Sequence, residues 1–316
     1  MHVVSSKDMG KTWKAEFTIK IEKDMREPYF LTINGTLHFY YFEAGTNPIA
    51  FEPSYLQRKE YLGPDLGWTS AESWGQESEV AWQYGVRNDW AYTISYSGDH
   101  YSVTELGQLS LHLNRSIDGL NWEPVGVSPF SKGGISEVGW AFDNDGIMWG
   151  IGRNEDGDET GWGSRIFFFD LENMEAPQWT EARSDPHIYE SPRMFNHEGE
   201  IYLVARTDPE GPFMSNLDWS TPLEHTYDLV AYSFRPHGTA LWKLDRTEAK
   251  LIKLLDLPGC GDTAFPSIVQ ISDHIFIIVN YSSPLTEECA NYSWVYGQVA
   301  PEGTMIYALQ LEFLST

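Results

Sequence analysis

The sequence of 316 residues has few basic side chains and few cysteines. It holds 46 acidic residues against 21 Lys and Arg, which gives a formal net charge of −25. A surface of this charge repels the phosphates of nucleic acids and the head groups of anionic membranes. We therefore expect neither nucleic acid nor a membrane as a partner.

Long apolar runs are also missing. The longest, such as residues 275–279, are too short to cross a bilayer, and the first residues lack the basic-then-apolar pattern of an export signal. We expect a soluble chain with no export signal in these residues, and the sequence does not indicate a compartment or an oligomeric state. The two cysteines, Cys260 and Cys289, do not make a disulfide framework, so we expect free thiols. No His, Cys and Asp residues have metal-ligand spacing, and we predict neither a metal site nor a cofactor.

Helical periodicity is almost absent as well. The apolar stretches are short and alternating, rich in Tyr, Phe, Trp, Ile and Val, and separated by Gly, Asn and Asp. With 41% hydrophobic and 15% aromatic residues, the chain has ample material for a packed core. This pattern predicts an all-β protein.

A unit of two strands around a tight turn occurs five times. The five turn pairs recur at about 55 residues, and at about 74 for the last, which is the scale of a four-stranded propeller blade. The pairs are Asn34-Gly35, Asn88-Asp89, Asp145-Gly146, Glu198-Gly199 and Ser272-Asp273. Further strands are expected at residues 109–113 and 122–125, 165–170, 229–234 with 251–254, and 305–313. We predict one β-propeller domain over residues 1–316, with five or six blades and six slightly preferred.

The opening stretch "SSKDMGKTW" predicts a hairpin between strands at residues 3–6 and 13–19. Asp8 can accept hydrogen bonds from backbone N–H groups, Gly10 can take a positive φ, and Trp13 can fold beneath the turn as an apolar plug. The last unit ends after its third strand. We therefore expect either that this N-terminal hairpin completes the C-terminal blade or that the N-terminal blade is incomplete.

The same stretch resembles the Asp-box of sialidases and related propellers, S-x-D-x-G-x-T-W, and "SIDGLNW" at residues 116–122 is a shorter variant. "MREP" at residues 25–28 resembles the Arg-containing start of an inner strand in that superfamily, and "GDTAFPSIV" with "IVNYSSP" near the C-terminus resembles the final blade of bacterial sialidase-like proteins. The resemblance implies that the Asp-box turns lie on the face opposite the active site. Because lectins also carry Asp-boxes, it implies the fold more firmly than it implies hydrolysis.

Acidic residues begin the inner strand of every predicted unit. In a propeller the start of the innermost strand and the end of the second strand emerge near the axis on one face, so we expect these acids to surround one opening. They are Glu27, Glu79, Glu137, Glu190 and Asp262.

The ends of the second strands add Glu43, Tyr96, Arg153, Arg206 and Tyr281. Arg26 and Arg193 stand beside acids, and Trp82 and Trp140 are close by. Arginines bind carboxylates bidentately, acids hold hydroxyls or move protons, and aromatic rings pack against sugar faces. The pattern favours a pocket for a glycan or a small sugar.

If the resemblance extends to mechanism, it implies a sialidase-like exo-glycoside hydrolase acting on a terminal, carboxylate-bearing sugar. Arg26, Arg153 and Arg206 would bind the carboxylate, and Tyr281 would be the nucleophile with Glu190 or Glu137 as its base. Two features depart from the family pattern. The family's Arg-Ile-Pro is Arg26-Glu27-Pro28 here, and the acid/base Asp has no clear counterpart, with Asp65 and Asp99 as weak candidates.

Three other interpretations stay open. A five-bladed furanosidase would use inner-strand carboxylates directly, with Glu190 as general acid. A glycan-binding propeller would use the same rim without catalysis. A lyase for uronate polysaccharides would use Tyr281 to move the proton, although the charge of −25 suits a polyanion poorly.

Overall fold

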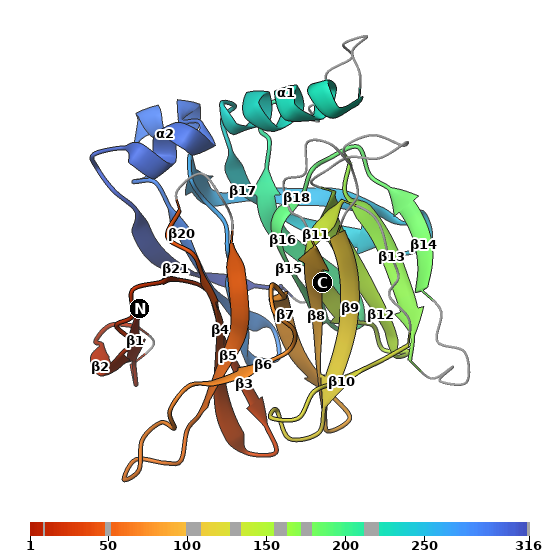
Figure 1. Cartoon of the computed structure of the whole chain (residues 1–316). Helices are drawn as coiled ribbons and strands as arrows, with labels where there is room; N and C mark the ends of the chain where they lie inside the picture. Colours follow the sequence, from red (N-terminus) through yellow and green to blue (C-terminus); the bar gives the residue numbers. More distant parts are fainter. Residues whose placement is uncertain are drawn as a thin grey trace. The chain divides into compact units, whose positions relative to one another are not determined.

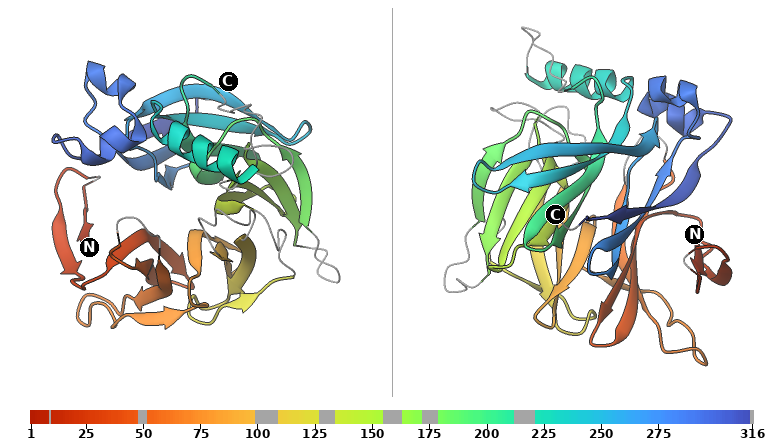
Figure 2. Two further views of the ribbon diagram at one scale, coloured as in Figure 1. Left: turned by 45° about the horizontal axis from the view of Figure 1, so that its top comes forward. Right: turned by 180° about the vertical axis from the view of Figure 1, so that it is seen from behind.

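The computed structural model is built almost entirely of antiparallel strands (Figures 1 and 2). It describes residues 1–8, 10–47, 52–98, 109–126, 134–154, 163–171, 179–211 and 221–314. The predicted all-β class is confirmed. The chain divides into two compact units: unit 1 holds Met1–Thr93 and Asn114–Glu123, and unit 2 holds Ile94–Leu113 and Pro124–Thr316.

Unit 1 contains an N-terminal hairpin and one four-stranded sheet of order β3-β4-β5-β6. The strands are β1 (His2–Ser5), β2 (Lys14–Thr18), β3 (Asp24–Ile33), β4 (Thr36–Ala44), β5 (Pro53–Glu60) and β6 (Glu72–Trp74). A second four-stranded sheet, β10-β9-β8-β7, includes the boundaries between the units in β8 and β9. Its strands are β7 (Val80–Arg87), β8 (Trp90–Gly98), β9 (Leu109–Ser116) and β10 (Glu123–Pro124).

Unit 2 contains three further sheets, of order β11-β12-β13-β14, β15-β16-β17-β18 and β19-β20-β21. The first two are formed by β11 (Ile135–Phe142), β12 (Ile147–Asn154), β13 (Arg165–Asp170), β14 (Trp179–Ser184), β15 (Glu190–His197), β16 (Glu200–Thr207), β17 (Gly238–Asp245) and β18 (Lys250–Cys260). The third is formed by β19 (Ser267–Ser272), β20 (Ile275–Ser282) and β21 (Met305–Glu312). The helical elements are α1 (Thr221–Ser233), η1 (Glu287–Asn291) and α2 (Trp294–Val299), and the longer helices lie at the same end of the unit 2 strands (Figures 1 and 2).

These sheets are the blades of a β-propeller. All five predicted turn pairs join the first two strands of a sheet. The described residues form five blades of three or four strands, the lower of the two expected counts, together with the separate β1–β2 hairpin.

One predicted strand is wrong. Residues 229–234 lie in or just after helix α1, and the strand that pairs with β16 is β17. Asp228 and Tyr232, four residues apart, are both buried, whereas Phe234 is exposed. The buried positions therefore follow the helical period, and the short apolar run at 229–234 does not reveal which period applies.

The core of unit 2 is formed by the central strands of its blades. Ile151 on β12, Leu203 on β16 and Trp242 on β17 belong to one buried cluster. Strand β16 is buried along nearly its whole length, which explains why its sequence "EIYLVART" is a continuous apolar run rather than an alternating one. These packed strands give the site a rigid support.

The turn between β1 and β2 has the hydrogen bonds predicted for an Asp-box. Asp8 accepts from the backbone N–H of Thr12 at 2.8 Å and from its hydroxyl at 2.6 Å, and Gly10 has φ +83°. These bonds lower the pKa of Asp8 to about 2. Trp13 lies close to Gly10 but is 60% exposed, so the prediction that it is an apolar plug is wrong.

Cys260 and Cys289 form a disulfide, so the expectation of free thiols is wrong. Their Cα atoms lie 5.7 Å apart although 29 residues separate them in the sequence. The bond ties the end of β18 to η1, a pairing that two isolated cysteines in a sequence do not reveal. In the described parts of the chain, no helix combines the length and apolar character that a membrane span requires.

Candidate active site

Backbone bulges mark the beginning of two inner strands of unit 2. The register shifts between Ile135 and Val138 on β11 and between Glu190 and Arg193 on β15, where Ser191 has φ +51°. A bulge changes the direction of the side chains around it, and strained positions of this kind are common at functional sites. The candidate acids Glu137 and Glu190 lie at these bulges.

Two arginines join the predicted acids of unit 2 into one network. Arg153, near the end of β12, contacts Glu137 Oε1 at 3.0 Å and Glu190 Oε1 at 2.6 Å. Arg206, near the end of β16, contacts Glu190 Oε2 at 2.8 Å and Asp262 Oδ1 at 3.7 Å. Three of the five predicted acids are therefore linked through two of the predicted arginines.

Glu190 is at the centre of this network. It is 2% exposed and lies directly opposite Arg206 in the β15–β16 ladder. Burial acts to raise its pKa, but Arg153 and Arg206 outweigh this effect and hold the pKa at about 2. Glu190 is therefore a fixed negative charge, and Arg206, whose pKa is raised mainly by Glu190 against the opposing effect of burial, is a fixed positive one.

Asp262 and Tyr281 form a hydrogen-bonded pair next to Arg206. The Tyr281 hydroxyl donates to Asp262 Oδ1 at 2.9 Å, and Arg206 Nε donates to the carbonyl of Thr263 at 2.7 Å. Burial raises the pKa of Asp262, although Arg206 and Tyr281 act to lower it. A carboxylate with a raised pKa is a stronger proton acceptor than an ordinary aspartate.

Helix α2 packs directly against Asp262. A Cβ atom on Gly297 would lie 2.2 Å from the backbone nitrogen of Asp262, so only glycine fits there, and the Trp294 side chain donates a hydrogen bond to the carboxylate. The Cys260–Cys289 disulfide fixes the segment that leads into this helix. The position of Asp262 thus depends on a helix and a disulfide that sequence reasoning did not connect with the site.

His237 and Tyr232 are two further residues that the sequence analysis missed. They are 2% and 6% exposed, and their ring centroids lie 4.5 Å apart. Neither the ring nitrogens of His237 nor the Tyr232 hydroxyl has a hydrogen-bond partner among the described residues. Burial lowers the pKa of His237 to about 3, so the imidazole is neutral. No spacing signal in the sequence links either residue to Glu190.

The other predicted residues of unit 2 have different surroundings. Trp140 is buried against Phe142, with ring centroids 5.5 Å apart, so it belongs to the core. Arg193 Nε donates to the carbonyl of Pro266 at 3.1 Å and thereby supports the start of β19. Tyr96 is buried.

Five predicted residues lie in unit 1, and their roles stay predictions. Arg26 pairs with Asp24 at 2.5 Å, and Glu43 pairs with Lys23 at 2.8 Å. Glu27 lies in a bulge with φ +50°. Glu79 is buried and accepts from the backbone of Gln76 at 2.7 Å, and Trp82 is buried as well. The weak candidate Asp65 is exposed, and Asp99 lies outside the described residues.

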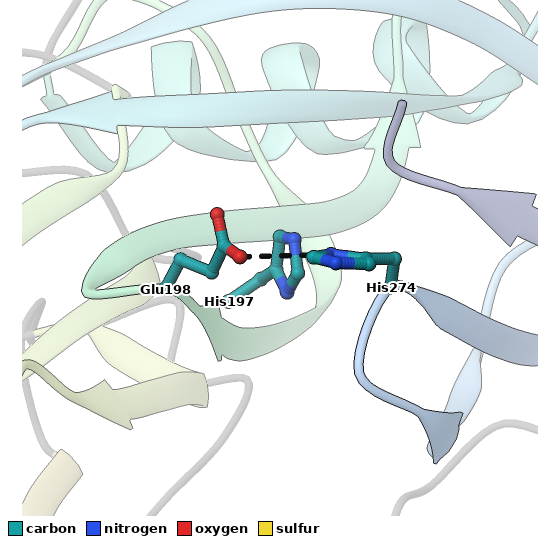
Figure 3. A group of neighbouring side chains, drawn as sticks. All are labelled: His197, Glu198 and His274. Carbon is teal, nitrogen blue, oxygen red and sulfur yellow. Dashed lines mark ion pairs between the residues drawn. The ribbon is translucent and has the colours of Figure 1, made fainter. Parts of the chain in front are cut away.

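Among the described residues, a group that could hold a metal ion lies elsewhere in unit 2. His197, Glu198 and His274 bring their side chains together at the turns that follow β15 and β19 (Figure 3). The prediction of no metal site rested on sequence spacing, and His274 is 76 residues beyond Glu198.

Comparison with known proteins gives matches in structure only. No family model matches the sequence, and no curated protein sequence does either. A protein of unknown function from Dyadobacter fermentans aligns over 99% of this chain and 84% of its own, with 15% identity and a TM-score of 0.64. The Trypanosoma rangeli sialidase, solved with sialic acid, aligns over 92% of this chain with 14% identity and a TM-score of 0.58, and this chain spans 48% of its length.

A thermostable family-43 glycoside hydrolase is a third structural relative. It aligns over 92% of this chain and 91% of its own, with 14% identity and a TM-score of 0.52. At identities this low, the likeness supports the propeller fold and leaves function to be argued from the site.

Proposed function

We propose that the protein is an exo-glycoside hydrolase in which Tyr281 is the nucleophile and Asp262 accepts its proton. The observation that carries the proposal is the 2.9 Å hydrogen bond from the Tyr281 hydroxyl to Asp262, next to Arg206. A nucleophile in contact with a base, and a base held by a third group, is the arrangement that activates a hydroxyl. The sialidase among the structural relatives is consistent with this assignment.

The reaction has two steps. In the first, the Tyr281 oxygen bonds to the anomeric carbon and the phenol proton moves to Asp262. The bond to the leaving-group oxygen breaks, and the leaving group departs as an anion that takes up a proton from solvent. In the second, a water oxygen bonds to the same carbon, the bond to Tyr281 breaks, and Tyr281 regains a proton from Asp262 while the water proton passes to solvent. Arg206 stabilises the negative charge that develops on the tyrosine oxygen.

The two arginines differ in exposure, and we assign them different roles. The Arg206 side chain is 6% exposed and has partners at Glu190, Asp262 and Thr263, so it fixes the Tyr281–Asp262 pair. The Arg153 side chain is 16% exposed. We assign to Arg153 the contact with a carboxylate on the terminal sugar.

A furanosidase-type mechanism is the second candidate, and the opposed pKa shifts favour it. Burial raises the pKa of Asp262, whereas Arg153 and Arg206 overcome burial and lower that of Glu190 to about 2. Carboxylates whose pKa values are pushed apart can divide the roles of acid and base. In this mechanism Asp262 is the general acid, because a carboxyl group with a pKa near 2 has no proton to give at neutral pH.

The test measures hydrolysis of 4-methylumbelliferyl glycosides, one series of sialic acid and one of neutral furanosides. The 4-methylumbelliferyl group leaves with little need for protonation. The measured rate on these glycosides therefore depends on attack by Tyr281 and proton transfer to Asp262, and not on a general acid. We expect turnover of the sialic acid donor, and a loss of about 10³-fold or more in kcat for Tyr281→Phe. Tyr296→Phe, an exposed tyrosine in α2, is the matched control and should retain full activity.

Three outcomes would contradict the tyrosine mechanism. Turnover of furanosides that Asp262→Asn abolishes and Tyr281→Phe retains indicates the furanosidase type. Glycan binding without turnover of any donor indicates a lectin. Cleavage of uronate polysaccharides to unsaturated products indicates a lyase.

A further inference from the structure

We propose that His197, Glu198 and His274 bind a divalent transition-metal ion, represented by Zn²⁺, and that this ion joins two neighbouring blades of unit 2. His197 ends β15, Glu198 lies in the turn that follows it, and His274 lies in the turn between β19 and β20. Figure 3 shows the three side chains gathered at one place. The site is independent of the proposed glycosidase chemistry, because Glu190 is at the opposite end of β15.

The donor atoms are nearly in position. One atom from each residue lies within 4.8 Å of the others, and His274 Nδ1 is 3.5 Å from Glu198 Oε1. Ligands of a tetrahedral zinc ion, about 2.0–2.1 Å from the metal, are roughly 3.3 Å from one another. The Glu198–His274 pair already has nearly this separation, and a donor atom of His197 lies within 4.8 Å of both.

Both histidines contact one aromatic residue, His197 through its ring and His274 through its backbone. The ring of Phe313 packs on His197 with centroids 4.2 Å apart, and the backbone N–H of Phe313 donates to the carbonyl of His274 at 2.9 Å. His197 is 6% exposed, and its imidazole makes ring contacts but no hydrogen bond in the part of the chain that the structure describes. A nitrogen lone pair of His197 is therefore available to a ligand.

The donor set selects the kind of ion. Two imidazoles and one carboxylate are ligands that zinc prefers, and they leave its fourth position for water. Ca²⁺ and Mg²⁺ prefer sites made of oxygen atoms, so they should bind here only weakly. The formal charge of −25 also favours the accumulation of cations near the chain.

Such an ion would cross-link the β15–β16 turn and the β19–β20 turn. Strands β15 and β19 belong to different sheets, with no hydrogen-bonded ladder between them. An ion that binds only when both turns are in place stabilises the folded state by mass action. The ion would thus stabilise the fold of unit 2.

The experiment titrates untagged, metal-free protein with ZnCl₂ by calorimetry and follows its thermal unfolding. We expect one ion per chain with a micromolar or tighter Kd, and a rise in Tm of about 5 °C when Zn²⁺ is at 100 times the Kd. His274→Gln, at a partly exposed position, should weaken binding at least 100-fold without loss of fold. Glu198→Gln should weaken it about 10-fold, and MgCl₂ should give no comparable rise in Tm.

His112→Gln is the matched control, because it removes a histidine from another blade of the chain. It should leave the Kd for Zn²⁺ unchanged. The proposal is overturned if wild-type protein binds Zn²⁺ only at millimolar concentration, or if His274→Gln and His112→Gln give the same Kd. Each result is independent of glycosidase activity, so failure of the metal site would leave the proposed function standing, and the reverse also holds.

Discussion

The polar side chains at the two ends of strand β15 differ in whether they are paired with charged partners. At the start, Glu190 is 2% exposed and paired with Arg153 and Arg206. The other end is about 23 Å away for a strand of eight residues. There His274 Nδ1 lies 3.5 Å from Glu198 Oε1, and no Lys or Arg among the described residues forms an ion pair with Glu198. The first end satisfies its charges within the protein, and the second leaves donor atoms for a ligand.

The difference shows how one rigid strand can support two kinds of site. A buried charge must have partners, so Glu190 depends on its arginines and supplies fixed electrostatics. A neutral imidazole carries no charge that needs a partner, so the far end can hold His197 buried against aromatic rings and His274 partly exposed until an ion arrives. Substitutions at the two ends should therefore have unequal costs.

The largest effect is expected for Glu190→Gln. Removal of the charge leaves Arg153 and Arg206 without their shared carboxylate, and loss of one member of a buried ion pair costs about 3–5 kcal/mol. Urea unfolding should show this decrease in the free energy of unfolding. Glu198→Gln at the far end is the matched control, with an expected change within about 0.5 kcal/mol. Equal decreases in the free energy of unfolding for the two substitutions would refute the proposed difference between the two ends of β15.

Loss of the disulfide should have the next largest effect. A closed loop of 29 residues corresponds to a stabilisation of about 3–4 kcal/mol in the chain-entropy model. The Cys260→Ser/Cys289→Ser variant should unfold at lower urea concentration and lose kcat, because α2 then holds Asp262 less firmly. Zn²⁺ affinity at His197, Glu198 and His274 should not change. A fall in Zn²⁺ affinity together with kcat would show that the two ends are coupled.

Acid should destabilise the Glu190 end selectively. The folded pKa of Glu190, about 2, is below its ordinary value of 4.5, so its contribution is present above pH 4.5 and lost as the pH falls toward 2. The loss is about 3 kcal/mol over this range. The contribution of Asp262 to stability has the opposite sign. Because the pKa of Asp262 is raised in the folded state, this contribution falls as the pH rises above 3.8, the ordinary pKa of an aspartate. The pH dependence of unfolding should become flatter in Glu190→Gln, and an unchanged profile would contradict the ion-pair assignment.

The smallest effect is expected for His197→Gln in metal-free buffer. The imidazole contributes ring contacts with Phe313 and Phe276, and their loss should cost about 1 kcal/mol or less. With Zn²⁺ present, the difference between wild type and variant should grow. A constant difference in Tm with and without Zn²⁺ would indicate packing alone.

Much of the fold followed from the sequence because local signals agree with it. The turn at Asn34-Gly35 and its four counterparts all join paired strands, and Glu137, Glu190 and Asp262 meet with Arg153, Arg206 and Tyr281 as their shared repeat positions predicted. Repetition places equivalent residues at equivalent ends of strands, so it carries spatial information.

The missed features depend on contacts that repetition does not encode. Residues 229–233 belong to helix α1, in which the buried positions Asp228 and Tyr232 are one helical turn apart. A run of six residues is too short to show this period. The Cys260–Cys289 bond and the His197–His274 contact each join segments brought together by tertiary packing. Trp13 is 60% exposed, and the hydrogen bonds from Thr12 to Asp8 form in the turn without an apolar cover.

The most direct test of the catalytic assignment is to identify the residue that carries the sugar during turnover. A fluorinated glycosyl fluoride of the hydrolysed sugar slows the second step, so the covalent adduct accumulates and peptide mass spectrometry locates it. Attachment to Tyr281, abolished in Tyr281→Phe and strongly reduced in Asp262→Asn, is the result that we predict. An adduct on a carboxylate such as Glu190 or Glu137, or turnover of the unfluorinated donor with no adduct at all, would contradict the assignment of Tyr281 as the nucleophile.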